Sequence, residues 1–201
     1  MSELRPRATS DNAAPGDSQW PRWEVLKQDN ERKAHQAVGS VHAADAEHAL
    51  LMARTVFARR PSAVSMWVAP AACVHAWTAQ ELEGHAAEAV PAGPAPSEPG
   101  AASQRYFVVR KSSNRRSMTF GDLVGEVAAP TLEAALARAL SEFADAPILA
   151  LWLIEADAVV RSDPAVADPW FGPALDKTYK QQSIYSSSAV ARKDAEEGVP
   201  E

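Results

Sequence analysis

An internal repeat constrains the fold of this chain more than any other feature of its sequence. Gly39 and Gly125 lie 86 positions apart, and the apolar residues that follow each glycine match at the same offset. Within each copy these residues recur at i, i+3, i+4, i+7 and i+11, the pattern of one buried helix face. The matched residues are Ala46, Ala49, Leu50, Ala53 and Phe57 in the first copy, and Leu132, Ala135, Leu136, Ala139 and Phe143 in the second.

Matching signals predict one helix and three strands in each copy. Asp45 and Thr131 stand where helix N-caps are expected, and Pro61 and Pro147 follow where the helices should end. We therefore expect helices near 45–60 and 131–145. Alternating or apolar runs typical of strands precede each helix twice and follow it once. These runs are 23–27, 37–43 and 66–68 in the first copy, and 106–110, 123–129 and 151–153 in the second.

The expected fold class is α+β, with two tandem β-β-α-β units. A single unit of this kind leaves one sheet face and an edge uncovered, so we expect the two copies to pack together as a pseudo-dimer. Residues 86–104 contain four prolines and two glycines, which predicts an extended Pro-rich linker. The predicted segments are a flexible arm at 1–19, a first unit at 20–85, the linker at 86–104, a second unit with a C-terminal strap at 105–190, and a charged tail at 191–201.

Composition excludes several classes of function. The net charge is −6 and basic residues form only short pairs, which gives nucleic-acid binding no electrostatic support. Cys73 is the single cysteine, so an internal disulfide is excluded. The first residues contain no apolar run of the kind found in signal peptides or membrane spans. The sequence therefore predicts a cytoplasmic location with no membrane contact.

The sequence offers no convincing catalytic or metal site. His42, Asp45 and His48 resemble a ligand set only by proximity, and the second copy has Ala128, Thr131 and Ala134 at these positions. Cys73 and His75 would face the same side of a strand, but an isolated cysteine is more often a small buried residue. We expect no catalytic, cofactor-binding or metal-binding residues.

Aromatic residues are the candidates for partner binding. Trp67 and Trp152 are the central aromatic residues of the strand after each helix, where packing against the sheet is favoured over exposure as an interface anchor. The strap at 168–190 has no counterpart after the first copy, and it packs either on its own domain or on a partner. The residues named for partner binding are Trp67, Trp152, Trp170, Phe171, Lys177 and Tyr179.

Several motifs resemble the phenylacetic acid degradation B family, the small B-type components of a bacterial ring-1,2-phenylacetyl-CoA epoxidase. The most specific is Val38-Gly-Ser-Val-His-Ala-Ala-Asp45. Trp20-Pro-x-Trp-Glu-Val25, Met66-Trp-Val-Ala69 and Phe171-x-Pro-Ala-x-x-Lys-x-Tyr179 are also similar. The family member is ordinarily a single short unit, so the resemblance implies a tandem duplication here.

The resemblance implies a non-catalytic, bridging subunit of this monooxygenase complex, acting in aerobic phenylacetate degradation. In that family the di-iron site belongs to the A-type component, which pairs with a C-type component, so the implied partners are catalytic subunits of the A and C types. Two other functions stay open: a stand-alone module that binds a small acidic or aromatic ligand between the copies, and an enzyme that uses His42, Cys73 or His75. Homo-oligomerisation also stays open.

Overall fold

Nine strands form one antiparallel sheet in the order β1-β5-β8-β6-β7-β3-β2-β4-β9. The computed structural model describes residues 7–8, 20–58, 63–86, 103–114 and 119–174, and the strand order refers to these residues alone. The strands are β1 (Arg7–Ala8), β2 (Arg22–Gln28), β3 (Gln36–His42), β4 (Ser65–Pro70), β5 (Val74–Thr78), β6 (Gln104–Lys111), β7 (Gly121–Ala129), β8 (Ala150–Glu155) and β9 (Val160–Arg161). The helices are α1 (Ala46–Phe57), α2 (Ala79–Ala86), α3 (Leu132–Glu142) and α4 (Ala167–Phe171), with 3-10 turns η1 (Ala71–Cys73), η2 (Ala156–Ala158), η3 (Pro164–Val166) and η4 (Gly172–Ala174).

The two halves of the chain have the same element order and the same strand register. Each contains two strands, a helix, a third strand, a 3-10 turn and a fourth strand. In the first hairpin Val25 pairs with Gly39, and in the second Val108 pairs with Gly125. Both hairpins have a register shift immediately after this pair. The structure therefore confirms the mixed α+β class and adds a fourth strand that periodicity did not predict.

The helices begin where the sequence predicts, because a side-chain cap satisfies a free backbone N–H in each. Asp45 accepts a hydrogen bond from the His48 N–H, and Thr131 accepts one from the Ala134 N–H. Both helices end earlier than expected, at Phe57 and Glu142.

A glycine and a phenylalanine make the same helix–sheet contact in each half. A Cβ atom on Gly39 would lie 2.9 Å from the Phe57 ring, and one on Gly125 would lie 2.5 Å from the Phe143 ring. The glycines thus give the rings room against the sheet. Leu50 and Leu136 are buried as expected, whereas Phe57 and Phe143 are only half-buried.

The fourth strand of each half pairs with the third strand of the other half. Strand β5 pairs with β8, with Ala76 opposite Trp152, and β9 pairs with β4, with Arg161 opposite Trp67. Strands β3 and β7 join the two halves at the centre through Gln36–Asp122 and Ala37–Gly121. Each half therefore completes the sheet of the other.

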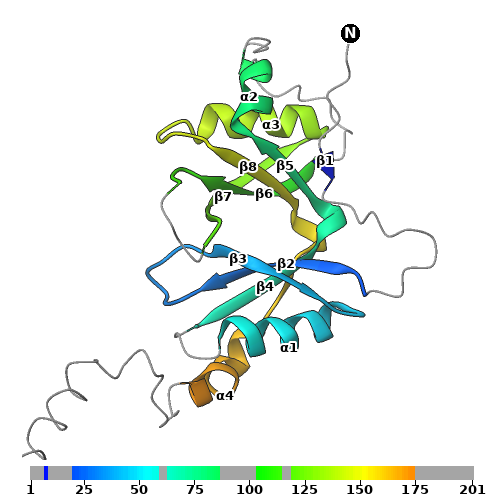
Figure 1. Ribbon diagram of the computed structural model, residues 1–201, viewed down its shortest axis with the longest axis vertical. Coiled ribbons are helices and arrows are strands. Elements are labelled where there is room, and N and C mark those ends of the chain that lie inside the picture. The colour runs from blue at the N-terminus through cyan, green and yellow to red at the C-terminus, as the bar shows by residue number, and fades with distance from the viewer. Residues whose placement is uncertain (1–6, 9–19, 59–62, 87–102, 115–118, 175–201) are drawn as a thin grey trace, which may run out of the picture.

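The short helices are exchanged in the same way. Phe171 of α4 is buried in the cluster beneath α1, while Trp77 of β5 and Leu82 of α2 are buried in the cluster beneath α3. The sheet folds so that its two parts, on either side of the β3–β7 pairing, face each other. A third cluster, which includes Leu26, Val109 and Ile154, fills the space between these two parts. Figure 1 shows the resulting layers, with α1 and α3 on opposite outer faces and the strands between them.

Several predicted segments lie wholly or partly outside the described residues. Residues 87–102 of the expected linker and the tail at 191–201 are outside them. Ala86 is the last residue of α2 and Gln104 is the first residue of β6. Within the expected arm, Arg7 and Ala8 pair with β5. No helix in the described part of the chain has both the length and the apolar character needed to cross a membrane.

Candidate functional site

Trp67, on β4, lies in the layer between the two parts of the sheet that face each other. It is half-buried and packs against the third cluster. Its ring centroid lies 3.9 Å from that of His35 and 5.2 Å from that of Phe107, and the Arg161 guanidinium lies 4.4 Å above it. His35, Phe107 and Arg161 therefore pack on the Trp67 ring, as expected of a residue that packs on the sheet.

Trp152, on β8, occupies the corresponding position in the second half, with different neighbours. It is half-buried and stacks on Phe120, with ring centroids 4.2 Å apart. The Lys111 ammonium lies 5.3 Å from the Phe120 ring. Both tryptophans therefore contact aromatic residues of this chain, and their role in partner binding stays a prediction.

His35 is a buried histidine in the layer between the two parts of the sheet. Its Nε2 lies 3.0 Å from the Ser65 hydroxyl, and its side chain is buried. Burial, followed by the nearby Arg161 charge, lowers the pKa of His35 from 6.5 to about 4. A neutral imidazole at physiological pH suits stacking on Trp67 better than acid–base chemistry.

The beginning of the strap folds against the first half of the chain. The Arg54 Nε–H of α1 donates a hydrogen bond to the Trp170 carbonyl, and the Arg54 guanidinium lies 5.8 Å from the Trp170 ring. Trp170 is partly buried, and Phe171 is 5% exposed. Of the four strap candidates, the structure places these two together, while Lys177 and Tyr179 lie outside the described residues.

The three residues considered as metal ligands do not converge. The His42 Nδ1–H donates to the Trp20 carbonyl, and Asp45 caps α1. His48 packs its ring edge-on to Trp20 at 4.7 Å. Among the described residues, no group of three or more His, Cys, Asp or Glu side chains is arranged to hold a metal ion.

Cys73 and His75 meet a residue that sequence reasoning missed, Glu155 on β8. The His75 Nε2 lies 3.1 Å from a Glu155 carboxylate oxygen. Burial, with Glu155 as the next cause, raises the pKa of the Cys73 thiol. A thiol held protonated is a poor nucleophile, so the arrangement argues against covalent catalysis. Only the pairing of β5 with β8 brings Glu155 here, and no local sequence pattern predicts that pairing.

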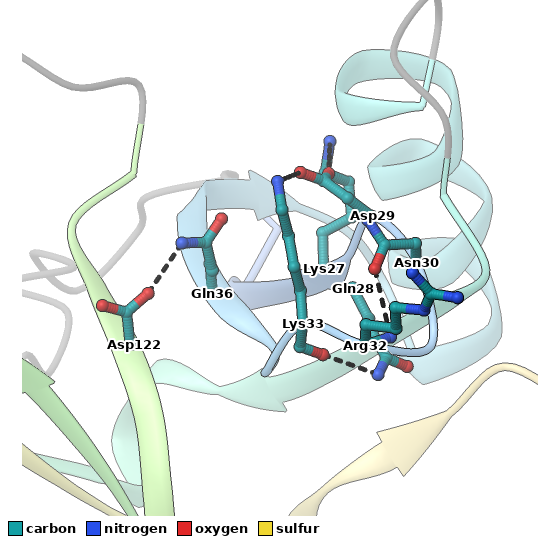
Figure 2. A network of polar contacts seen from close by, with 8 residues as sticks. All are labelled: Lys27, Gln28, Asp29, Asn30, Arg32, Lys33, Gln36 and Asp122. Carbon is teal, nitrogen blue, oxygen red and sulfur yellow. Dashed lines mark hydrogen bonds and ion pairs between the residues drawn. The ribbon is translucent and has the colours of Figure 1, made fainter.

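Polar contacts close the β2–β3 hairpin and also lie at the joint between the halves (Figure 2). Asp29 accepts from Lys27 at 2.8 Å and from Lys33 at 3.2 Å, and the Lys27 hydrogen bond is the main cause of its lowered pKa. Across the joint the Gln36 side-chain amide donates to the Asp122 carboxylate at 2.6 Å. The loop contacts and the Gln36–Asp122 contact are two separate groups, the first closing the hairpin and the second lying at the joint, and these residues offer no nucleophile or open ligand set.

Comparison with known proteins identifies relatives of both halves. The family described as "Phenylacetic acid degradation B" matches residues 19–90 and 103–191. A relative in Escherichia coli (strain K12), named as the B-type component of 1,2-phenylacetyl-CoA epoxidase, is 42% identical over 52 residues, which is 26% of this chain and 55% of that relative. The chain therefore spans about half the length of this curated relative. No solved structure matches the chain.

Proposed function

This chain belongs to the phenylacetic acid degradation B family, and from that membership we propose that it is a non-catalytic, bridging subunit of a multicomponent phenylacetyl-CoA epoxidase in aerobic phenylacetate degradation. The family match to both halves is the observation that carries the proposal. The related Escherichia coli protein is named as the B-type component of such an enzyme. The proposed partners are catalytic subunits of the A and C types, in the cytoplasm.

The fold is proposed to be a tandem duplication packed as a pseudo-dimer. The equal hairpin registers, with the same register shift in each, support this origin. The reciprocal pairing of β5 with β8 and of β9 with β4 supports it as well. In this proposal one chain takes the place of two single-unit subunits, with the pseudo-twofold axis passing between Gln36 and Asp122.

The non-catalytic role is supported by what the candidate groups do in the structure. His35 packs on Trp67, and Asp45 caps α1. The pKa of the Cys73 thiol is raised, which disfavours the reactive thiolate. Buried side chains fill the space between the halves, and this supports a subunit over a module that binds a ligand there.

The proposed partner surface is the strap, with Trp170, Lys177 and Tyr179 as its main contacts. Trp170 is partly buried and lies next to Arg54, so it can present its remaining surface beside α1. Phe171 is proposed to support this surface from within, because it is buried beneath α1. Trp67 and Trp152 pack in the third cluster instead, and their part in partner binding stays a prediction.

Co-purification tests the proposal. A tagged chain is expressed with its A- and C-type partners, and we expect a stable complex that epoxidises phenylacetyl-CoA, with the iron in the A-type partner. Deletion of 168–190 should weaken assembly, measured by calorimetry, by at least about tenfold. Failure of the full chain to bind either partner, or turnover by the isolated chain, would overturn the proposal.

A further inference from the structure

The outer face of α1 is apolar, although it faces solvent. Leu51 is 46% exposed, Met52 is 36% exposed and Val56 is 53% exposed. These are three of the exposed large hydrophobic side chains of the described residues, and they lie within six consecutive positions of one helix. Trp20, 54% exposed, borders this face through its contact with His48. Clustered exposed apolar groups mark a surface that something covers.

The equivalent face of α3 has the opposite chemistry. Positions 137, 138 and 142 correspond to 51, 52 and 56 at the offset of 86, and there the chain has Ala137, Arg138 and Glu142. All three are exposed, and Arg138 and Glu142 form an ion pair at 3.5 Å. Because the two helices have matched caps and matched buried residues, the fold does not require apolar residues on the outside of α1.

The described chain ends beside this face. Arg54 lies three residues after Leu51, so the two side chains are neighbours on the helix surface. Arg54 contacts the Trp170 carbonyl and ring, and Phe171 is buried beneath α1. The packing of α4 on α1 is therefore continuous with the apolar face. Figure 1 shows α4 directly against α1.

The sequence that follows Ala174 carries suitable side chains. Residues 175–185 contain Leu175, Tyr179, Ile184 and Tyr185, and the rest of the segment is polar: an aspartate, two lysines, a threonine, two glutamines and a serine. Helix α1 has 12 residues and is about 18 Å long at 1.5 Å per residue. A chain that advances about 3.3 Å per residue covers that length well within this segment.

We propose that residues 175–185 lie across the outer face of α1 and cover Leu51, Met52 and Val56. The segment continues the contact that α4 begins at Arg54. Leu175, Ile184 and Tyr185 pack on the helix, while Lys177, Tyr179 and Lys180 remain toward solvent, where Lys177 and Tyr179 stay available to a partner. Among the described residues, no segment covers the charged face of α3. The first half of the chain thus carries a layer that the second half lacks, and this layer is a property of the isolated chain.

Hydrogen exchange of the full-length isolated chain, followed by mass spectrometry, tests the proposal. We expect amides of 175–185 to exchange at least about tenfold more slowly than an unstructured peptide. The double variant Leu51→Glu/Met52→Glu should remove this protection. The matched variant Ala137→Glu/Arg138→Glu on α3 should leave it unchanged. Exchange of 175–185 at the unstructured rate, or equal protection in both variants, would overturn the proposal.

A second measurement does not depend on the folding of those variants. Truncation after Ala174 should raise the rate of Met52 oxidation by at least about threefold, while Met66, which is fully buried in the core, reports whether the fold is intact. An unchanged rate at Met52 would overturn the proposal. Dimerisation through this face would also overturn it. In that case the mass of the wild-type chain would double as its concentration rises, and Leu51→Glu/Met52→Glu would abolish the doubling, because the occupant would be a second copy of the chain. No catalytic partner is present, so these outcomes are separate from those of the co-purification.

Discussion

The two halves of this molecule share their element order and hairpin register but differ at several positions that contact something other than their own core. Gly39 with Phe57 and Gly125 with Phe143 make the same helix–sheet contact. By contrast, Arg161 lies over Trp67, while the residue opposite Trp152 is Ala76. A pair of identical subunits could not differ in this way. The comparison shows that two halves with the same element order and hairpin register can carry different residues at corresponding surface positions.

The largest expected effect comes from separating the halves. We expect the fragments 20–86 and 103–191 to be unfolded as monomers, because β4 loses β9, β8 loses β5, and each helix layer loses buried residues. Mixing them in equal amounts should restore a cooperative thermal transition, followed by circular dichroism. A cooperative transition from a monomeric fragment, independent of its concentration, would show that the exchange is not needed.

Truncation of the matched phenylalanines should cost nearly as much in each half. Phe57→Ala and Phe143→Ala are each expected to lower the free energy of unfolding by about 3 kcal/mol, at the lower end for such changes because both rings are half-buried. Chemical denaturation measures the effect, with Leu136→Ala as a fully buried reference. A cost below about 1 kcal/mol in either half would break the equivalence of the two helix–sheet contacts.

His35 has no counterpart in the second half, where Gly121 stands, and it should make stability depend on pH. Its pKa is lowered to about 4 in the folded chain, so the unfolded chain binds more protons between pH 6.5 and 4. Stability is therefore full above about pH 6.5 and falls toward pH 4, by at most about 3 kcal/mol. Comparison with His35→Gln isolates this contribution, since the variant should lose that part of the pH dependence. Parallel pH profiles would contradict it.

Gly39 and Gly125 should respond differently to substitution by alanine, although both contact a phenylalanine ring in the same way. Gly39 has a φ of 140°, whereas Gly125 has no positive φ. Gly125→Ala should cost about 1–3 kcal/mol through contact with Phe143, and that cost should vanish in a Phe143→Ala background. Gly39→Ala should keep about 1–2 kcal/mol of its cost in a Phe57→Ala background, because the backbone strain remains. Two double-mutant cycles by urea denaturation measure this, and equal residual costs would refute the distinction.

The smallest expected effect lies at the joint between the halves. Gln36 and Asp122 occupy equivalent positions and form a hydrogen bond that identical residues could not reproduce in the same form. A cycle of Gln36→Ala and Asp122→Ala should give a coupling free energy of about 0.5–1 kcal/mol, since the pair is exposed. A coupling indistinguishable from zero would mean that the backbone pairing of β3 with β7 suffices.

The sequence predicts the local elements well because their causes are local. Helix caps, the apolar helix face and the period of the strands all act within a few residues, and α1 and α3 begin as expected. The exchange could not be predicted in the same way. Strand β5 would find matching partners in β4 or β8, because the two copies look alike at these positions. Three-dimensional packing decides between them, and it also decides that Glu155 meets His75 and that Arg161 covers Trp67.

The exchange also has a consequence for synthesis on the ribosome. When Pro70 has emerged, β4 has an unpaired edge, and the layer beneath α1 still lacks Phe171. At the usual elongation rates of about 5–20 residues per second, this condition lasts on the order of 10 s. A nascent chain with an open strand edge is a substrate for chaperones and for pairing with a neighbouring nascent chain on the same message. Synthesis of β9 and α4 thus determines when the strand edge and the core of the N-terminal half are covered.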